Sequence, residues 1–446
     1  MARRRYWPEQ FLYYDGEGIA RHLEKMAARG WRLEKIGALS WRYGRAEPAK
    51  VHCAVTYFPE ASEYNPYPTD SQEEFYDYCR EAGWELVTEW DQMQIFSTER
   101  VHPVPIETDE AARVRVIHRA MLRRFLPANL LLFALLVIQL GIFITGVLQN
   151  PAANLSKPSV LLITLALALM GLSVFLTLTG YLAWYLRARK AAETGKRLAG
   201  TEQRFRTLTV AVAALGVLSV VFAALSTAGS RGGPWYALLV TGEAAAFVAL
   251  VAGVRAYMRR RGVERKQNRN ITLAVAAALS LLMINVIPGA VIGPRAAELH
   301  IVDRTVLPLA LEDLGIPEEG LVSTWESRSS PLVAFRAGEQ SGPYDSGLPW
   351  LRYEVSDVKL PMLFDLCLDG YLDRYDNEYG RLTGGRFRPL NDPAWDAEVW
   401  QVWDDEGPWP YYLACKDGRI VWLMTDDFLT PEQTKTASEK LFGRTI

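Results

Sequence analysis

The hydrophobic positions of the chain divide it into three parts. The middle part, residues 111–294, contains five apolar runs without the polar stripe that a surface helix of a soluble protein carries. Each run is long enough to cross about 30 Å of hydrocarbon at a rise of about 1.5 Å per residue. We therefore predict five transmembrane helices, at about residues 125–148, 160–186, 207–227, 235–257 and 271–292.

The charges of the chain are distributed unevenly. Residues 1–124 carry a net charge of −2, residues 125–294 of +12 and residues 295–446 of −12. The segment before the first apolar run and the loops after the second and fourth hold five, seven and six Lys and Arg residues, while the other two connections hold one each. Because basic loops stay on the cytoplasmic side, we predict a multi-pass protein of the cell (cytoplasmic) membrane with its amino terminus inside and its carboxy terminus outside.

The amino-terminal part, residues 1–110, contains one short sequence pattern twice, and we call each copy a phrase. Residues 22–36 read HLEKMAARGWRLEKI, and residues 75–89 read FYDYCREAGWELVTE. In each phrase apolar residues stand four and seven positions before a glycine, which places them on one helix face. Gly30 and Gly83 then suit a left-handed helix cap, and Trp31 and Trp84 open a strand. We expect the two Gly-Trp pairs to do the same structural job, each tryptophan buried between helix and sheet.

Strand-like runs surround both phrases. The runs at residues 10–15 and 50–58 precede the two predicted helices, and two further runs follow each Gly-Trp pair. The pattern predicts a duplicated strand-helix-strand-strand unit that forms an antiparallel sheet with both helices on one face, an α+β sandwich.

The residues of the two phrases, together with VTYFP and QIFST, resemble the DUF2812 family over roughly residues 6–100. The resemblance implies a bacterial cytoplasmic module of unassigned biochemistry, often tethered to membrane spans and sometimes encoded near PadR-type transcriptional regulators. It supplies no catalytic residues. The tandem units are also similar to small-molecule-binding folds of the ferredoxin-like, GyrI-like kind, in which a ligand lies between the halves; this is an analogy of fold alone.

Motifs that carry chemistry are missing from the sequence. The five histidines have no metal-ligand spacing, the four cysteines form no CxxC, and neither a phosphate-binding loop nor a nucleophile elbow is present. We therefore expect no enzyme, no metal and no cofactor. Cys79 stands four residues before Gly83 and is predicted to be a buried thiol.

Glu243 is the conspicuous polar residue of the apolar runs. It lies eight residues inside Trp235, about 12 Å deep, where a carboxyl group is costly and by default functional. The structural alternative is a protonated side chain that bonds to a neighbouring helix, for example to Asn285 or Gln139. Both interpretations stay open.

The carboxy-terminal part, residues 295–446, is acidic and rich in aromatic residues. Asp417-Gly418 between two apolar runs predicts a hairpin, and Thr430 with Gln433 predicts the capped start of a closing helix. This part therefore reads as an extracytoplasmic α+β domain. Because an exterior domain permits disulfides, we hypothesise a bridge between Cys367 and Cys415.

The architecture favours a non-enzymatic sensor or interaction protein of the bacterial inner membrane. It would couple the extracytoplasmic domain to a cytoplasmic module that binds a protein or a small molecule. The expected partners are the lipid bilayer and an unidentified partner of the module, with the PadR-type system as a candidate; direct nucleic-acid binding is not expected. The alternative is a transporter or transporter accessory subunit that uses Glu243.

Overall fold

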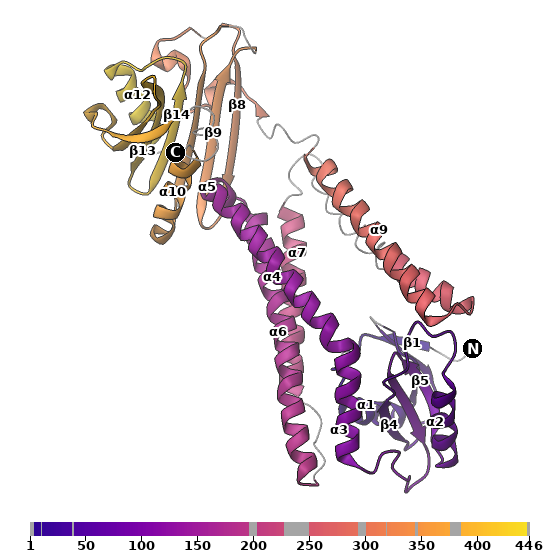
Figure 1. Cartoon of the computed structure of the whole chain (residues 1–446). Helices are drawn as coiled ribbons and strands as arrows, with labels where there is room; N and C mark the ends of the chain where they lie inside the picture. The colour runs from indigo at the N-terminus through magenta and orange to yellow at the C-terminus, as the bar shows by residue number, and fades with distance from the viewer. Residues whose placement is uncertain are drawn as a thin grey trace. The chain divides into compact units, whose positions relative to one another are not determined.

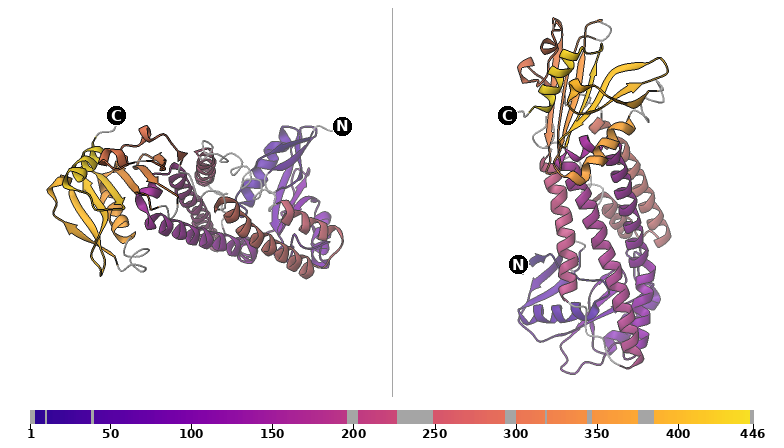
Figure 2. Two further views of the ribbon diagram at one scale, coloured as in Figure 1. Left: turned by 90° about the horizontal axis from the view of Figure 1, so that it is seen from above. Right: turned by 90° about the vertical axis from the view of Figure 1, so that its left-hand side faces the viewer.

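The computed structural model describes residues 4–9, 11–37, 40–195, 203–226, 249–292, 300–317, 319–343, 347–374 and 385–443 (Figure 1; Figure 2 gives two further views). The chain divides into two compact units. The first comprises Met1–Ile138, Leu167–Leu218 and Leu238–Val286; the second comprises Gln139–Ala166, Ser219–Ala237 and Ile287–Ile446.

The amino-terminal module consists of two strand-helix-strand-strand units with the same strand order. The first unit is β1 (Arg4–Trp7), α1 (Gly16–Ala28), β2 (Trp31–Lys35) and β3 (Trp41–Arg45), in the sheet order β1-β3-β2. The second is β4 (His52–Tyr57), α2 (Asp70–Glu81), β5 (Glu85–Trp90) and β6 (Met93–Thr98), in the order β4-β6-β5. Both antiparallel sheets have an irregularity in register just after the Gly-Trp pair, between Leu33 and Lys35 and between Leu86 and Thr88. The predicted duplication of topology is confirmed.

Three details of the predicted module are wrong. The two helices do not share one face, because α1 packs on Val55 and Ile95 of the second sheet whereas α2 packs on its other face, at Ala54 and Phe96. The units form two separate three-stranded sheets rather than one. The edge strands β2 and β5 are neighbours, but each has a β-bulge, which interrupts a regular ladder. The first strand is β1 rather than residues 10–15, because Asp15 instead caps α1 by accepting a hydrogen bond from Gly18 N at 3.0 Å.

Helix α1 contributes to the main core of the module. Leu23 and Met26, the residues seven and four positions before Gly30, are buried as predicted. Val55 and Ile95 of the second sheet belong to the same core cluster, so α1 packs on residues of both units. Helix α2 covers the other face of the second sheet, where Cys79 is fully buried beside Trp84 and Phe96.

The helices of the middle part follow α3 (Glu110–Ala120) and a π-helical turn (Met121–Phe125). They are α4 (Leu126–Gln149), α5 (Pro151–Leu155), α6 (Pro158–Glu193), α7 (Gln203–Ser226), the helical residues 249–260 and α9 (Arg265–Ile292). Among the described residues, α4 and α6 are the helices long and apolar enough to cross a membrane, and α7 contains a shorter apolar part, Thr207–Phe222. The described structure thus supports two such helices where five are predicted. Glu243 and most of the predicted fourth helix lie outside the described residues.

The carboxy-terminal domain is an eight-stranded antiparallel sheet in the order β11-β12-β13-β14-β10-β9-β8-β7. Its strands are β7 (His300–Ile301), β8 (Val322–Ser329), β9 (Val333–Ser341), β10 (Leu351–Val358), β11 (Arg386–Leu390), β12 (Glu398–Trp403), β13 (Pro408–Lys416) and β14 (Arg419–Thr425). Helix α12 (Pro431–Phe442) belongs to one core cluster of this sheet, and α10 (Phe364–Arg374) with α5 belongs to another.

The local signals in this domain are confirmed. Asp417 and Gly418 both have positive φ, +51° and +80°, as a tight primed turn between β13 and β14 requires. Thr430 and Gln433 form the predicted reciprocal cap at the start of α12.

The predicted bridge between Cys367 and Cys415 is not formed in the structure. Both residues are buried free thiols of one hydrophobic cluster. Cys415 Sγ lies instead 3.9 Å from Glu398 Oε2. Burial raises the pKa of both thiols to about 11, with the charge of Glu398 adding to the effect at Cys415.

Candidate functional site

A groove of about 480 Å³ lies on the amino-terminal module, within the first of the two compact units of the chain. Its walls are the end of β2, the loop between β4 and α2, the turn between β5 and β6, and the helical residues 249–260. The side chains that line it are Lys35, Ile36, Ala61, Ser62, Glu63, Asn65, Tyr67, Pro68, Gln72, Glu89, Trp90, Asp91, Arg255, Ala256 and Arg259. Its size is that of a small-molecule or peptide site.

Two ion pairs hold the helical residues 249–260 against the groove. Arg255 pairs with Glu63, and Arg259 Nη2 lies 3.0 Å from Glu89 Oε1. The two arginines are four residues apart, so they project from one face of the helix. Their carboxylate partners are half-buried, with 17% and 31% of the side chain exposed, which limits the screening of both pairs by solvent.

The loop between β4 and α2 also accepts hydrogen bonds from three basic or polar side chains that come from other segments of the unit. These bonds run from Arg123 Nη1 to Pro59 O at 2.6 Å, from Arg265 Nη1 to Glu60 O at 3.1 Å, and from Asn268 Nδ2 to Tyr64 O at 3.1 Å. Asn268 is fully buried. The loop therefore joins the module to the π-helical turn before α4 and to the first turn of α9.

Glu89 is the polar centre of the groove floor. It accepts hydrogen bonds from Tyr76 Oη at 2.9 Å and from Gln72 Nε2 at 3.2 Å, in addition to its pair with Arg259. Burial and the charge of Glu89 raise the pKa of Tyr76, so its hydroxyl stays a donor at physiological pH. The charge of Glu89 is therefore compensated from two helices, α2 and residues 249–260.

A buried polar row runs across the second sheet beside Glu89. Gln94 lies directly opposite Glu89 on one side and opposite Thr56 on the other. Gln94 and Thr56 are 0% and 3% exposed, and among the described residues neither the Gln94 amide nor the Thr56 hydroxyl has a hydrogen-bond partner. Such groups cost roughly 1–3 kcal/mol each when they are buried without a partner. The row is a polar feature that the fold alone does not require.

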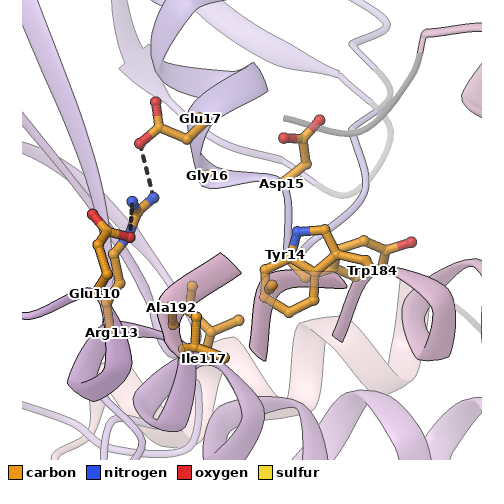
Figure 3. Close-up of a pocket in the computed structure, with 11 residues that line it drawn as sticks. Tyr14, Asp15, Gly16, Glu17, Glu110, Arg113, Ile117, Trp184 and Ala192 are labelled. Atoms are coloured by element: carbon orange, nitrogen blue, oxygen red, sulfur yellow. Dashed lines mark hydrogen bonds and ion pairs between the residues drawn. The ribbon is translucent and has the colours of Figure 1, made fainter. Parts of the chain in front are cut away.

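A second, small cavity joins the loop before α1 to α3 and α6 (Figure 3). Arg113 of α3 is its central cation and pairs with Glu17 at 2.9 Å, with Glu110 at 3.4 Å and with Glu107 at 3.5 Å. Tyr14 and Trp184 form its apolar wall. The cavity measures about 30 Å³, room for a water molecule but not for an organic ligand. We interpret it as part of the structural contact between the loop before α1 and helices α3 and α6.

The two glycines of the repeated phrase have the same conformation in the structure, but the two tryptophans differ in burial. Gly30 and Gly83 both take the left-handed conformation, with φ of +79° and +86°, as predicted. Trp84 is buried, as predicted, but Trp31 is partly exposed between Arg5 and Arg45. The expected equivalence of the two tryptophans is therefore wrong.

None of the residues singled out from the sequence lines the groove. The charge of the basic loop that contains Arg259 predicts membrane topology alone. The pairing of Arg255 with Glu63 and of Arg259 with Glu89 has no local signal, because the partners lie 192 and 170 residues apart. Across the described residues, no group of three His, Cys, Asp or Glu side chains is placed to hold a metal ion.

Comparison with known proteins assigns the module. Residues 15–129 match the model of the family described as protein of unknown function (DUF2812). The amino-terminal module is a DUF2812 domain. The match reaches past the expected end near residue 100 and includes α3, the π-helical turn and the first residues of α4. No curated protein and no solved structure matches the chain.

Proposed function

We propose that this protein is a non-enzymatic membrane sensor or interaction protein that couples the carboxy-terminal domain to the DUF2812 module. In this proposal the module lies in the cytoplasm and binds a protein or a small molecule. The carboxy-terminal domain lies outside, and five helices cross the membrane between them. Glu243, the centre of the transporter alternative, lies outside the described residues.

The ends of α4 carry the proposal. On its amino-terminal side, Ala120 and Met121 are fully buried in the core of the DUF2812 module. On its carboxy-terminal side, α5 follows at once, and Ala152 belongs to a core cluster of the carboxy-terminal domain. One apolar helix of 24 residues therefore has a domain core at each end. We propose that α4 transmits a displacement at one end to the other.

The exposure of α4 and α6 supports their insertion in a membrane. Only 6% of the apolar window of each helix is buried, whereas the core helix of a soluble protein is mostly buried. Contacts within each unit agree with the orientation expected from the basic loops. The module contacts Arg123, Arg259 and Arg265, all from basic segments. The carboxy-terminal domain contacts α5, from a connection with a single lysine: Ser330 Oγ donates to Leu155 O at 2.6 Å.

We further propose that the two ion pairs of the groove form the switchable part of this coupling. We call Arg255–Glu63 and Arg259–Glu89 the latch. A ligand or partner that enters the groove competes with the latch arginines for Glu63 and Glu89, or with the carboxylates for the arginines. Release of residues 249–260 then changes how the helices are held at the module. A ligand acts in this way only to the extent that it binds the two states differently.

The proposal is tested by hydrogen exchange on the full chain in lipid nanodiscs. Glu63→Arg breaks one latch pair, and Glu73→Arg, an exposed carboxylate of α2, is the matched control. We expect Glu63→Arg to increase exchange in residues 249–268 and to change exchange in residues 150–157 as well. The control should change neither. Coupling is reciprocal, so Gly370→Ala, which disturbs the contact with α5, should alter exchange at residues 249–268. Local opening at the groove with no change at residues 150–157 would refute the coupling.

A further inference from the structure

The two Gly-Trp phrases fold alike but are covered differently. In the second strand-helix-strand-strand unit the indole Nε1–H of Trp84 donates to Val104 O at 2.8 Å. Val104 belongs to the segment VHPVPI, residues 101–106, and Ile106 packs on the same core cluster as Trp84. A proline-containing segment of this chain therefore covers Trp84 and satisfies its indole.

In the described part of the first strand-helix-strand-strand unit, no segment covers the tryptophan in this way. Trp31 is partly exposed, and its indole N–H has no hydrogen-bond partner among the described residues. The chain that leaves β3 passes over Gly30, where Ala46 N donates to Gly30 O at 3.0 Å, and then enters β4. The helix caps themselves are alike: Arg45 Nη1 donates to Arg29 O, and Arg100 Nη1 donates to Ala82 O, in each case the carbonyl before the glycine. What differs between the units is the segment over the tryptophan.

The surroundings of Trp31 are strongly cationic. The guanidinium carbons of Arg5 and Arg45 lie 5.4 and 5.1 Å from its ring centroid, within the range of cation–π attraction. Trp7 packs edge-on against it at 5.0 Å. Arg5 and Arg45 have no carboxylate within ion-pair distance in the described structure. The carboxylate of the same sheet, Glu34, is already held by Arg4 and Arg42. Acidic side chains of an occupant would therefore complement the charge of this patch.

We propose that Trp31, Arg5 and Arg45 form a docking site for an extended, proline-containing segment with acidic side chains, supplied by a partner protein. The segment takes over the place that residues 101–106 hold on Trp84. One of its carbonyls accepts the Trp31 indole N–H, its proline rings pack on Trp31 and Trp7, and its carboxylates pair with the two arginines. Recognition of polyproline II segments on aromatic surfaces exploits a conformation that is already ordered before binding. The site names a partner class for the DUF2812 module and rests on the proposed role of that module in binding.

The test uses the full chain in nanodiscs of neutral lipid and a fluorescein-labelled peptide, EVHPVPIE, which places acidic residues around the sequence of residues 101–106. We expect saturable binding by fluorescence anisotropy and a loss of at least tenfold in Trp31→Ala and in Arg45→Glu. Tyr6→Ala, a change at an exposed ring on the opposite face of β1 from Arg5, is the control and should bind normally. The peptide QVHPVPIQ should bind more weakly. Because Arg45→Glu changes an exposed side chain, it keeps the test decisive if Trp31→Ala does not fold.

Failure of this site is distinguishable from failure of the coupling. Absence of saturable binding, or equal binding by Trp31→Ala and Arg45→Glu, would overturn the docking site. So would tighter, Trp31-dependent binding of a 20-residue oligothymidylate or of anionic phosphatidylglycerol vesicles, because either would assign the patch to another class of partner. The hydrogen-exchange response of Glu63→Arg, measured in the Trp31→Ala background, should be unchanged. If it persists while the peptide does not bind, the partner class alone is wrong.

Discussion

Replacing Trp84 by alanine should expose a thiol that the native DUF2812 module protects. Trp84, Cys79 and Phe96 form a buried cluster between α2 and the second sheet, with Cys79 0% and Trp84 5% exposed. Truncation of a buried tryptophan costs about 3–5 kcal/mol, and loss of the indole hydrogen bond to Val104 O is part of that cost. Opening of the cluster should become easier by a similar amount.

The assay is alkylation of Cys79 in the full chain, followed by mass spectrometry of the peptide that contains it. Burial, with a smaller effect of Glu107, raises the pKa of Cys79 to about 11, so the native thiol reacts slowly for two reasons. Every 1.4 kcal/mol is about a factor of ten, so Trp84→Ala should accelerate labelling by about 100-fold to 4,000-fold. Trp84→Phe keeps a ring and loses the hydrogen bond, and should accelerate labelling by about tenfold or less.

Trp31→Ala is the matched control, because the same residue stands in the same phrase but packs on a different cluster. It should change the labelling rate of Cys79 by less than about threefold, since a partly exposed ring of another core contributes little to the opening of this one. An equal acceleration in the two alanine variants would refute the view that the two tryptophans have diverged.

Three further predictions concern the caps, the thiols and α5. Gly30→Ala and Gly83→Ala should both destabilise the module by about 1 kcal/mol or more in chemical denaturation, because both glycines have positive φ. Gly30→Ala should cost more, because its Cβ would lie 2.8 Å from the backbone oxygen of Ala46, whereas the Cβ at Gly83 meets the movable Arg100 side chain. The carboxy-terminal domain should lose stability as the pH rises from about 9 to about 11 and not below, because the thiols of Cys367 and Cys415 ionise near pH 9 in the unfolded chain and near pH 11 in the folded domain. Cys367→Ala should reduce the loss of stability over this pH range. Gly370→Ala should loosen α5, because a Cβ there would lie 2.3 Å from Pro151 Cδ. Protease cleavage at residues 150–157 should rise while cleavage in α1 and β2 does not.

Local patterns in the sequence predicted much of the fold. The positions of α1 and α2, the left-handed glycines, the β13–β14 hairpin and the cap at Thr430 each depend on residues within a few positions of one another. The repeated strand order of the module also followed from a phrase written twice. The run at residues 10–15 failed as a strand because its apolar pattern serves a buried loop: Tyr14 is 1% exposed, and Asp15 ends the run as a helix cap.

The candidate site could not be predicted in the same way. The groove depends on pairs such as Arg255–Glu63, which join segments 192 residues apart, and no local period encodes such a pair. The two tryptophans show the limit most clearly. Trp31 and Trp84 stand in the same local phrase and begin equivalent strands, yet one is covered by residues 101–106 and the other is not. The difference comes from the segments that follow β3 and β6. These segments lie outside the repeated phrase, so the phrase cannot predict it.

The membrane topology is the claim on which the account rests, and alkaline phosphatase fusions test it most directly. The enzyme is active only outside the cytoplasm. A fusion after Ile446 should be active and a fusion after Gln203 inactive, because five crossings from a cytoplasmic module place the carboxy-terminal domain outside. Activity after Gln203, or inactivity after Ile446 in a stably expressed fusion, would contradict the account, since the two domains would then not lie on the predicted sides of the membrane.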